Sequence, residues 1–177
     1  MKLSKITRDQ FVANLEGEES FAKTFVSKAD MSKLWDNCFA IMDGDKIKGA
    51  YAISVTKTTP KIANFQLLYT FVNYKKQGVA RALLDASVIK AQEMGAEYMR
   101  ISSEIKAIKF YEKCGVKFIG RQKSGTLLTI VKLTSDIIGE CEIDISDERL
   151  NRYLYGKSKG VPVEIFEAYK KKDQEEW

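Results

Sequence analysis

The chain has 177 residues, 45% of them hydrophobic and 30% charged, which suits a single globular domain. It contains no histidine, so Ser-His-Asp and Cys-His nucleophiles and histidine metal sites are excluded, and acid–base chemistry must use carboxylates, tyrosine, lysine or water. The net charge of +5 is uneven, with 22 basic and 14 acidic residues at positions 1–139 against 7 and 10 at positions 140–177. The basic part suits a phosphorylated cofactor or a nucleic acid, although a soluble lysine-rich surface is the commonest explanation of such a balance.

The N-terminal part of the chain is expected to form short strands and small helices. Residues 2–7 predict a first strand, and residues 8–35 predict two short helices. Two apolar segments, 38–42 and 46–55, flank the sequence Asp43-Gly44-Asp45. Because glycine tolerates a positive φ, an Asp-Gly step between such segments predicts a β-hairpin.

Residues 64–72 are rich in aromatic and β-favouring side chains, so they predict a central strand. The helix that follows is the strongest periodic feature of the chain, and Gly95 is expected to close it. Its stripe of small and apolar side chains consists of Ala80, Leu83, Leu84, Ser87, Val88, Ala91 and Met94.

The chain continues with a predicted strand at 98–102, a helix at 104–114 and a hairpin of residues 116–121 and 126–133. This order of elements predicts an α/β (α+β) fold, with a mixed, mostly antiparallel sheet flanked by helices. The three cysteines, Cys38, Cys114 and Cys141, form no C-x-x-C pair and are expected to be buried thiols.

Residues 134–177 are expected to form a C-terminal helical extension to the domain at 1–133, with an edge strand and two short helices. The extension contains too many apolar side chains for a freely solvated arm, so they must pack either on the chain's own sheet or on a second subunit, which would make a homodimer. The side chains in question are Leu150, Tyr153, Leu154, Ile165, Phe166 and Tyr169.

The turn between the central strand and its helix has a composition that suits phosphate. A glycine at a helix N-terminus leaves backbone N–H groups and the positive end of the helix dipole open to an anion. Two lysines precede Gly78 and Arg81 follows it. Taken alone, however, one glycine in such a turn is more often a turn residue only.

Together with its surroundings, this turn resembles the central signature of the GNAT family of N-acetyltransferases, Q/R-x-x-G-x-G/A. Residues 104–116 look like the family's second motif, N-x-x-A-x-x-x-Y-E-K-x-G-F. The resemblance covers residues 1–133. It implies that acetyl-CoA is the co-substrate, that no metal is needed, and that a primary amine attacks the thioester directly in a ternary complex.

The resemblance also implies roles for individual residues. The strand backbone at Leu68, Tyr69 and Thr70 would pair with the pantetheine arm, and Tyr111 would protonate the departing thiolate as general acid. The pyrophosphate would be held by Lys75, Lys76, Gln77, Gly78, Val79, Ala80 and Arg81. A buried core tyrosine is the alternative interpretation of Tyr111.

Several positions depart from the family pattern. Lys75 replaces Gln or Arg, and Val116 replaces phenylalanine. Glu104 stands where the family usually has asparagine, while the central strand offers Asn64 and Gln66 where many members carry a basic glutamate. Glu104 is therefore a candidate general base, and a solvated glutamate at a helix start is the equally weighted alternative.

The acceptor amine, on a small molecule or a protein, cannot be identified from the sequence. Aminoacyl-tRNA is a variant that the basic part favours and the acidic extension opposes. From another class, the chain could be a non-catalytic acyl-CoA-binding or interaction module. The N-terminus has no signal-peptide pattern and the longest uncharged apolar run, residues 63–74, cannot span a bilayer, so a cytoplasmic protein without a membrane partner is expected.

Overall fold

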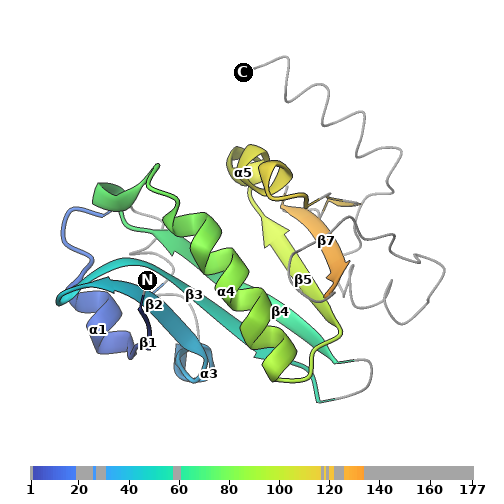
Figure 1. Ribbon diagram of the computed structural model, residues 1–177, viewed down its shortest axis with the longest axis horizontal. Helices are drawn as coiled ribbons and strands as arrows, with labels where there is room; N and C mark the ends of the chain where they lie inside the picture. Colours follow the sequence, from blue (N-terminus) through green and yellow to red (C-terminus); the bar gives the residue numbers. More distant parts are fainter. Residues whose placement is uncertain are drawn as a thin grey trace. The chain divides into compact units, whose positions relative to one another are not determined.

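The computed structural model describes residues 2–18, 26, 31–57, 61–116, 118, 120–121 and 126–133 (Figure 1). The chain divides into two compact units, Met1–Ala96 and Glu97–Trp177, and each is described by itself. The edge strand and helices expected within residues 134–177 lie outside the described residues, as does Cys141.

The first unit contains an antiparallel sheet of four strands in the order β1-β2-β3-β4. The predicted hairpin is confirmed: Asp43 pairs with Lys46, and Gly44 takes a φ of 56° in the two-residue turn between them. The described elements are β1 (Leu3–Lys5), α1 (Arg8–Ala13), α3 (Met31–Trp35), β2 (Cys38–Asp43), β3 (Lys46–Val55), β4 (Ile62–Thr70), the 3-10 helix η1 (Val72–Tyr74) and α4 (Val79–Glu93).

One face of this sheet is covered by an aromatic cluster from α1, α3 and the end of β4. Phe11 lies 5.4 Å from both Trp35 and Phe71, measured between ring centroids, and Tyr69 meets Phe71 edge to face at 5.2 Å. All four side chains are less than 9% exposed. Their burial fixes the N-terminal segment against the end of β4.

The opposite face is covered by α4, which lies across β3 and β4 (Figure 1). The predicted stripe is confirmed over its middle, where Leu83, Leu84, Ser87, Val88 and Ala91 are buried. Its two ends, Ala80 and Met94, are only partly buried. Gly95 takes a φ of 83° just after the helix, and the Ala96 N–H returns to the Ala91 carbonyl at 2.9 Å. α4 therefore ends at a glycine in the left-handed conformation, as expected from the position of Gly95 in the sequence.

The second unit contains β5 (Tyr98–Ser103), the 3-10 helix η2 (Ile105–Ala107), α5 (Ile108–Lys113), β6 (Gly120–Arg121) and β7 (Leu127–Lys132). β7 pairs antiparallel with both β5 and β6, so the pairing of the predicted C-terminal hairpin is confirmed. Its first strand is shorter than predicted and covers Gly120–Arg121 rather than 116–121. Cys38 of the first unit and Cys114 of the second are both buried free thiols, as expected.

Other predicted boundaries were also wrong, by one to a few residues, and three of them have a clear physical reason. The first strand ends at Lys5 rather than at residue 7, because Thr7 leaves the ladder to cap α1 with a capping box. The central strand covers Ile62–Thr70 rather than 64–72, because the chain turns into η1 at Val72. The helix predicted from residue 104 starts as a 3-10 turn and becomes α-helical at Ile108.

Candidate functional site

The candidate site begins where the chain leaves β4. Past Thr70 the Phe71 N–H still donates to the Lys48 carbonyl of β3, at 3.0 Å. The next donor, the Val72 N–H, has moved beyond β3 and is accepted by the Glu18 carboxylate, with N···O distances of 3.0 and 3.2 Å. Just after β4, the backbone N–H of Phe71 is therefore bound by strand β3, and that of Val72 is bound by the Glu18 side chain.

β4 is irregular in the stretch that precedes this exit. Its pairing with β3 slips between Ala52 and Ile53, so that Gln66 is an extra residue between Phe65 and Leu67. Such bulges bend a strand and increase its local twist, and they are common next to active sites. At the end of the strand, the Thr70 hydroxyl oxygen is buried and has no hydrogen-bond partner.

The 75–80 turn combines an exposed surface with an unusual backbone. Lys75 is extended, with φ −63° and ψ 151°, whereas Lys76 and Gly78 have φ values of 61° and 79°. Lys76 has the only positive φ among the described non-glycine residues, and holding such a conformation costs about 1–3 kcal/mol, so the surroundings must impose it. Both lysines are exposed, together with Gln77 and Gly78.

The turn leaves room for an anion at the start of α4. A Cβ placed on Gly78 would meet no atom within 4 Å. The Ala82 N–H donates to the Gly78 carbonyl at 3.1 Å, as the first turn of the helix closes, so the N–H groups of Val79 and Ala80 at the start of the helix have no helical acceptor. Open space, N–H donors and two lysines suit a pyrophosphate.

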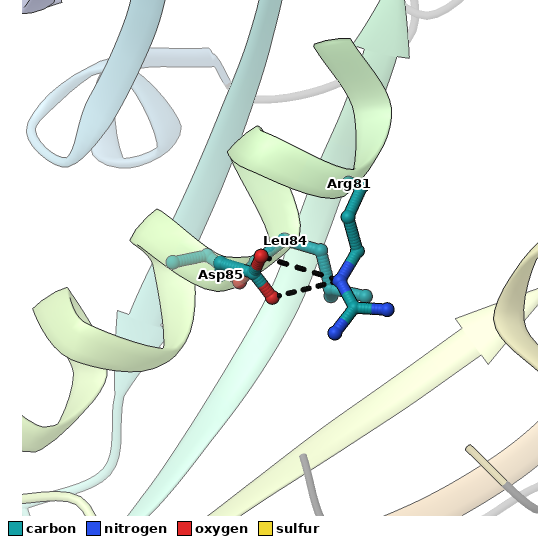
Figure 2. A network of polar contacts seen from close by, with 4 residues as sticks. Arg81, Leu84 and Asp85 are labelled. Carbon is teal, nitrogen blue, oxygen red and sulfur yellow. Dashed lines mark hydrogen bonds and ion pairs between the residues drawn. The ribbon is translucent and has the colours of Figure 1, made fainter. Parts of the chain in front are cut away.

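Arg81 is the third residue of α4 and follows the 75–80 turn directly. Its Nε atom donates to both carboxylate oxygens of Asp85, at 3.0 and 3.2 Å, while Figure 2 shows the two terminal nitrogens of the guanidinium pointing away from that carboxylate. Both side chains are more than 40% exposed, so this ion pair contributes little to stability. The ion pair does restrict the orientation of the Arg81 side chain, which the family resemblance predicts to help bind the pyrophosphate.

The position of α4 depends on a glycine in β3. A Cβ on Gly49 would lie 2.7 Å from the Tyr69 carbonyl oxygen, 2.8 Å from Leu83 Cδ1 and 2.9 Å from Val79 Cγ1. These distances are shorter than real Cβ contacts. Only glycine therefore lets the first turns of α4, and with them the 75–80 turn, approach the end of β4 this closely.

The β2–β3 hairpin supports the segment that enters the turn. The Tyr74 hydroxyl of η1 donates to the Asp43 carboxylate at 3.2 Å, and Lys48 Nζ lies 5.3 Å from the centre of the Tyr74 ring. Gln77 donates its side-chain amide to the Asn73 carbonyl at 3.0 Å. The hairpin thus holds the segment before the turn, and Gln77 ties the turn to that segment.

Tyr111 and Glu104 belong to the second unit and differ in environment. Tyr111 is 5% exposed, and the centre of its ring lies 5.0 Å from that of Phe110 and 5.6 Å from that of Phe118. Burial, assisted by the nearby Cys114 thiol, raises the pKa of Tyr111 above its usual value, so the phenol stays protonated. Glu104 is exposed and forms an ion pair with Lys106 at 2.9 Å. The roles of both residues remain predictions.

Solved structures with a similar fold are acetyltransferases. One from Escherichia coli, which acts on alanine of a ribosomal protein, has 16% identity and a TM-score of 0.57, with 76% of this chain and 94% of that chain covered. Aminoglycoside 6′-acetyltransferase type Ii has 16% identity and a TM-score of 0.58, with 76% and 99% covered. An acetyltransferase from Bacillus subtilis in complex with CoA has 18% identity and a TM-score of 0.55, with 75% and 97% covered.

These similarities define a GNAT-like α/β fold, as the sequence predicted. The family model of the acetyltransferase (GNAT) domain matches residues 5–135 of the sequence. The chain therefore belongs to the GNAT acetyltransferase family and is an enzyme of this acyltransferase type. The comparison with curated protein sequences gives no significant match. Among the described residues, no helix is long and apolar enough to cross a membrane, and no cluster of three or more potential metal ligands is found.

Sequence reasoning missed three residues that contact the segments next to the turn, Gly49, Glu18 and Asp43. Gly49 carried one available signal, since a glycine inside a strand often marks a close approach of another element. Glu18 and Asp43 carried none, because each contacts a residue more than 30 positions away. Only the folded first unit brings these three residues to the segments before and after the turn.

Proposed function

We propose that this enzyme transfers an acetyl group from acetyl-CoA to a primary amine. The observation that carries the proposal is the 75–80 turn, where open space at Gly78, N–H groups without a helical acceptor and exposed lysines form an anion site at the start of α4. Membership of the GNAT family makes a CoA pyrophosphate the anion to expect there. Similar structures that contain CoA support this choice.

The chain's own groups supply binding and proton transfer. The backbone at Leu68 to Thr70 holds the pantetheine arm and polarises the thioester carbonyl, and the 75–80 turn with Arg81 holds the pyrophosphate. The amine nitrogen forms the new C–N bond, the C–S bond breaks, and Tyr111 gives its proton to the departing thiolate. A phenol is protonated at neutral pH even at its ordinary pKa, and burial raises the pKa of Tyr111 further, so the proton is present before transfer.

The amine must also lose a proton. Neither Asn64 nor Gln66 of β4 can accept one, so we propose Glu104 as the base, acting directly or through water. Its exposed ion pair with Lys106 would have to open first. If a Glu104→Gln variant has an unchanged pH–rate profile, Glu104 is not the base, and bulk water takes the proton from the amine.

The acceptor amine belongs to a small molecule or a protein in this proposal. Structures of the same fold act on acceptors as different as a ribosomal-protein alanine and an aminoglycoside, so the fold does not define the acceptor. Aminoacyl-tRNA is less favoured because residues 140–177, which make up most of the extension, are acidic. The buried free thiols of Cys38 and Cys114 support a reducing compartment, and we place the reaction in the cytoplasm.

The test starts with titration calorimetry of acetyl-CoA into the protein, followed by incubation with labelled acetyl-CoA and a cell extract that is separated into small molecules, protein and RNA. Saturable binding and label in an amine-bearing fraction are expected. Absence of acetyl-CoA binding would refute the proposal. Tight binding without CoA release over a broad panel of amines would favour the acyl-CoA-binding module.

A further inference from the structure

The Glu18 carboxylate contacts two different groups at the end of β4. It accepts a hydrogen bond from the Tyr69 hydroxyl at 2.8 Å through Oε2, and both of its oxygens lie within hydrogen-bond distance of the Val72 N–H. The contacts link positions 51 and 54 residues apart in sequence. Glu18 itself is half-buried, and its own N–H is fixed on the Leu15 carbonyl at 3.1 Å.

The Val72 N–H is a special donor because it is the first of the 3-10 helix η1. Donors at the start of a helix have no acceptor within the helix, and a side-chain oxygen that accepts them stabilises the first turn. Phe71, which precedes the helix, provides no such side chain. Glu18 therefore caps η1 from a remote part of the chain.

Tyr69 makes this cap rigid. Its ring is 6% exposed and packs edge to face against Phe71 and Phe11 in the aromatic cluster. A hydroxyl on a fixed ring leaves the bound carboxylate few alternative positions. The cap on Val72 is thus positioned by the core rather than by solvent-exposed rotamers.

The 75–80 turn comes directly after η1 in the chain. The Lys75 N–H donates to the Val72 carbonyl at 3.3 Å, and Lys76 then adopts its strained positive φ. A strained conformation persists only when the surroundings determine it. Loosening Val72 removes one of the contacts that impose it.

We propose that Glu18 is a positioning residue for the cofactor turn: by capping η1 it holds residues 75–80 in the conformation that binds the CoA pyrophosphate. This rests on the proposed use of acetyl-CoA at that turn. Glu18 touches neither the thioester nor the amine in this role, so its loss should weaken acetyl-CoA binding and leave the chemical step unchanged.

The experiment compares Glu18→Ala with Glu18→Gln, whose amide oxygen can still accept from Val72, and with Glu16→Ala, which removes an exposed negative charge two residues away. If uncapping leaves the turn competent for only about 10–20% of the time, Kd and KM for acetyl-CoA rise roughly 5–10-fold, with kcat unchanged within about twofold. Glu18→Gln should restore most of the affinity, and Glu16→Ala should behave as wild type.

Hydrogen exchange of the free protein gives a readout that does not depend on activity. Glu18→Ala should speed exchange at Val72 and through the turn, and Tyr69→Phe, which keeps the packed ring, should do so to a smaller degree. Wild-type acetyl-CoA affinity in a folded Glu18→Ala variant would overturn the proposal, and so would a loss of kcat shared by the Gln and Ala variants, which would indicate a role in proton transfer. If the wild-type protein fails to bind acetyl-CoA, the proposed function fails, while the exchange at Val72 still reports whether the cap exists.

Discussion

Replacing Gly49 with alanine tests whether the close approach of α4 to β3 positions the candidate cofactor site. The added methyl group would lie 2.7–2.9 Å from three atoms, one of them the backbone oxygen of Tyr69 and two of them on the buried side chains of Val79 and Leu83. Ordinary van der Waals contact begins near 3.4 Å, so the neighbours must move by roughly half an ångström or more. Neither side chain can escape into solvent, since both are at most 3% exposed.

Overpacking of this kind costs about 1–3 kcal/mol of folding free energy. For a chain of this size, a loss of 1 kcal/mol lowers Tm by about 2–4 °C, so Gly49→Ala should melt roughly 2–12 °C below wild type. Because Val79 is the first residue of α4, part of the displacement reaches the turn at Gly78. If about 0.5–1 kcal/mol of it opposes ligand binding, the Kd for acetyl-CoA rises roughly 2–5-fold.

The assay is thermal unfolding combined with acetyl-CoA titration well below Tm. Gly95→Ala is the matched control, because it forces alanine into a φ of 83° at the other end of α4 without a clash against the start of the helix. The control should lose stability and keep its affinity for acetyl-CoA. A Gly49→Ala variant that is as stable as wild type, or one that loses stability with the same affinity as the control, would refute the reasoning.

Four further outcomes are expected. Acetyl-CoA should raise Tm, and Gly78→Glu should abolish the shift by placing bulk and negative charge in the anion site; an unchanged shift would remove the turn from the site. Tyr111→Phe should lower kcat by roughly 10²–10⁴-fold if chemistry limits turnover, whereas full activity would return Tyr111 to a core role. Burial raises the pKa of Cys38 from 9.0 to about 12, so the contribution of this thiol to folding stability should be constant below pH 9 and be lost as the pH rises towards 12, by up to about 1.4 kcal/mol per pH unit. Between pH 9 and 12 the stability of Cys38→Ala should therefore fall less steeply than that of wild type, and an equal slope would contradict the assignment. Truncation after Leu133 should lower solubility or change the oligomeric state, seen by light scattering, while acetyl-CoA binding survives; lost binding would mean that the extension completes the site.

The elements of the first unit that the sequence predicted best are those with strong local signals. The Asp-Gly step marked the β2–β3 hairpin, and the stripe from Leu83 to Ala91 marked α4, because both patterns concern residues that are neighbours in the final structure. The end of β4 was placed two residues too late because Phe71 and Val72 have β-favouring side chains. At Val72 the conformation is decided by the start of η1, with its N–H on Glu18, rather than by strand propensity.

The candidate site was predicted in the same uneven way. Gly78 was identifiable because its positive φ and missing Cβ are properties of the residue itself. The bulge at Gln66 was not, since a register slip depends on how β3 and β4 align over their whole length. Glu104 was identified from its motif position alone, and its exposed ion pair with Lys106 became visible only in the structure.

The connection between β4 and α4 shows why motif residues alone do not define such a site. Three separate parts of the first unit hold it: the Lys48 carbonyl fixes Phe71, the Glu18 carboxylate fixes Val72, and the Asp43 carboxylate accepts from Tyr74. Each contact comes from a segment that precedes β4 in the sequence. The conformation of the turn therefore depends on the folded first unit and not on residues 75–80 alone. A substitution that removes either side-chain contact, at Glu18 or at Asp43, should therefore act on acetyl-CoA affinity without touching the ligand, and the two effects should be non-additive because both side chains support one segment.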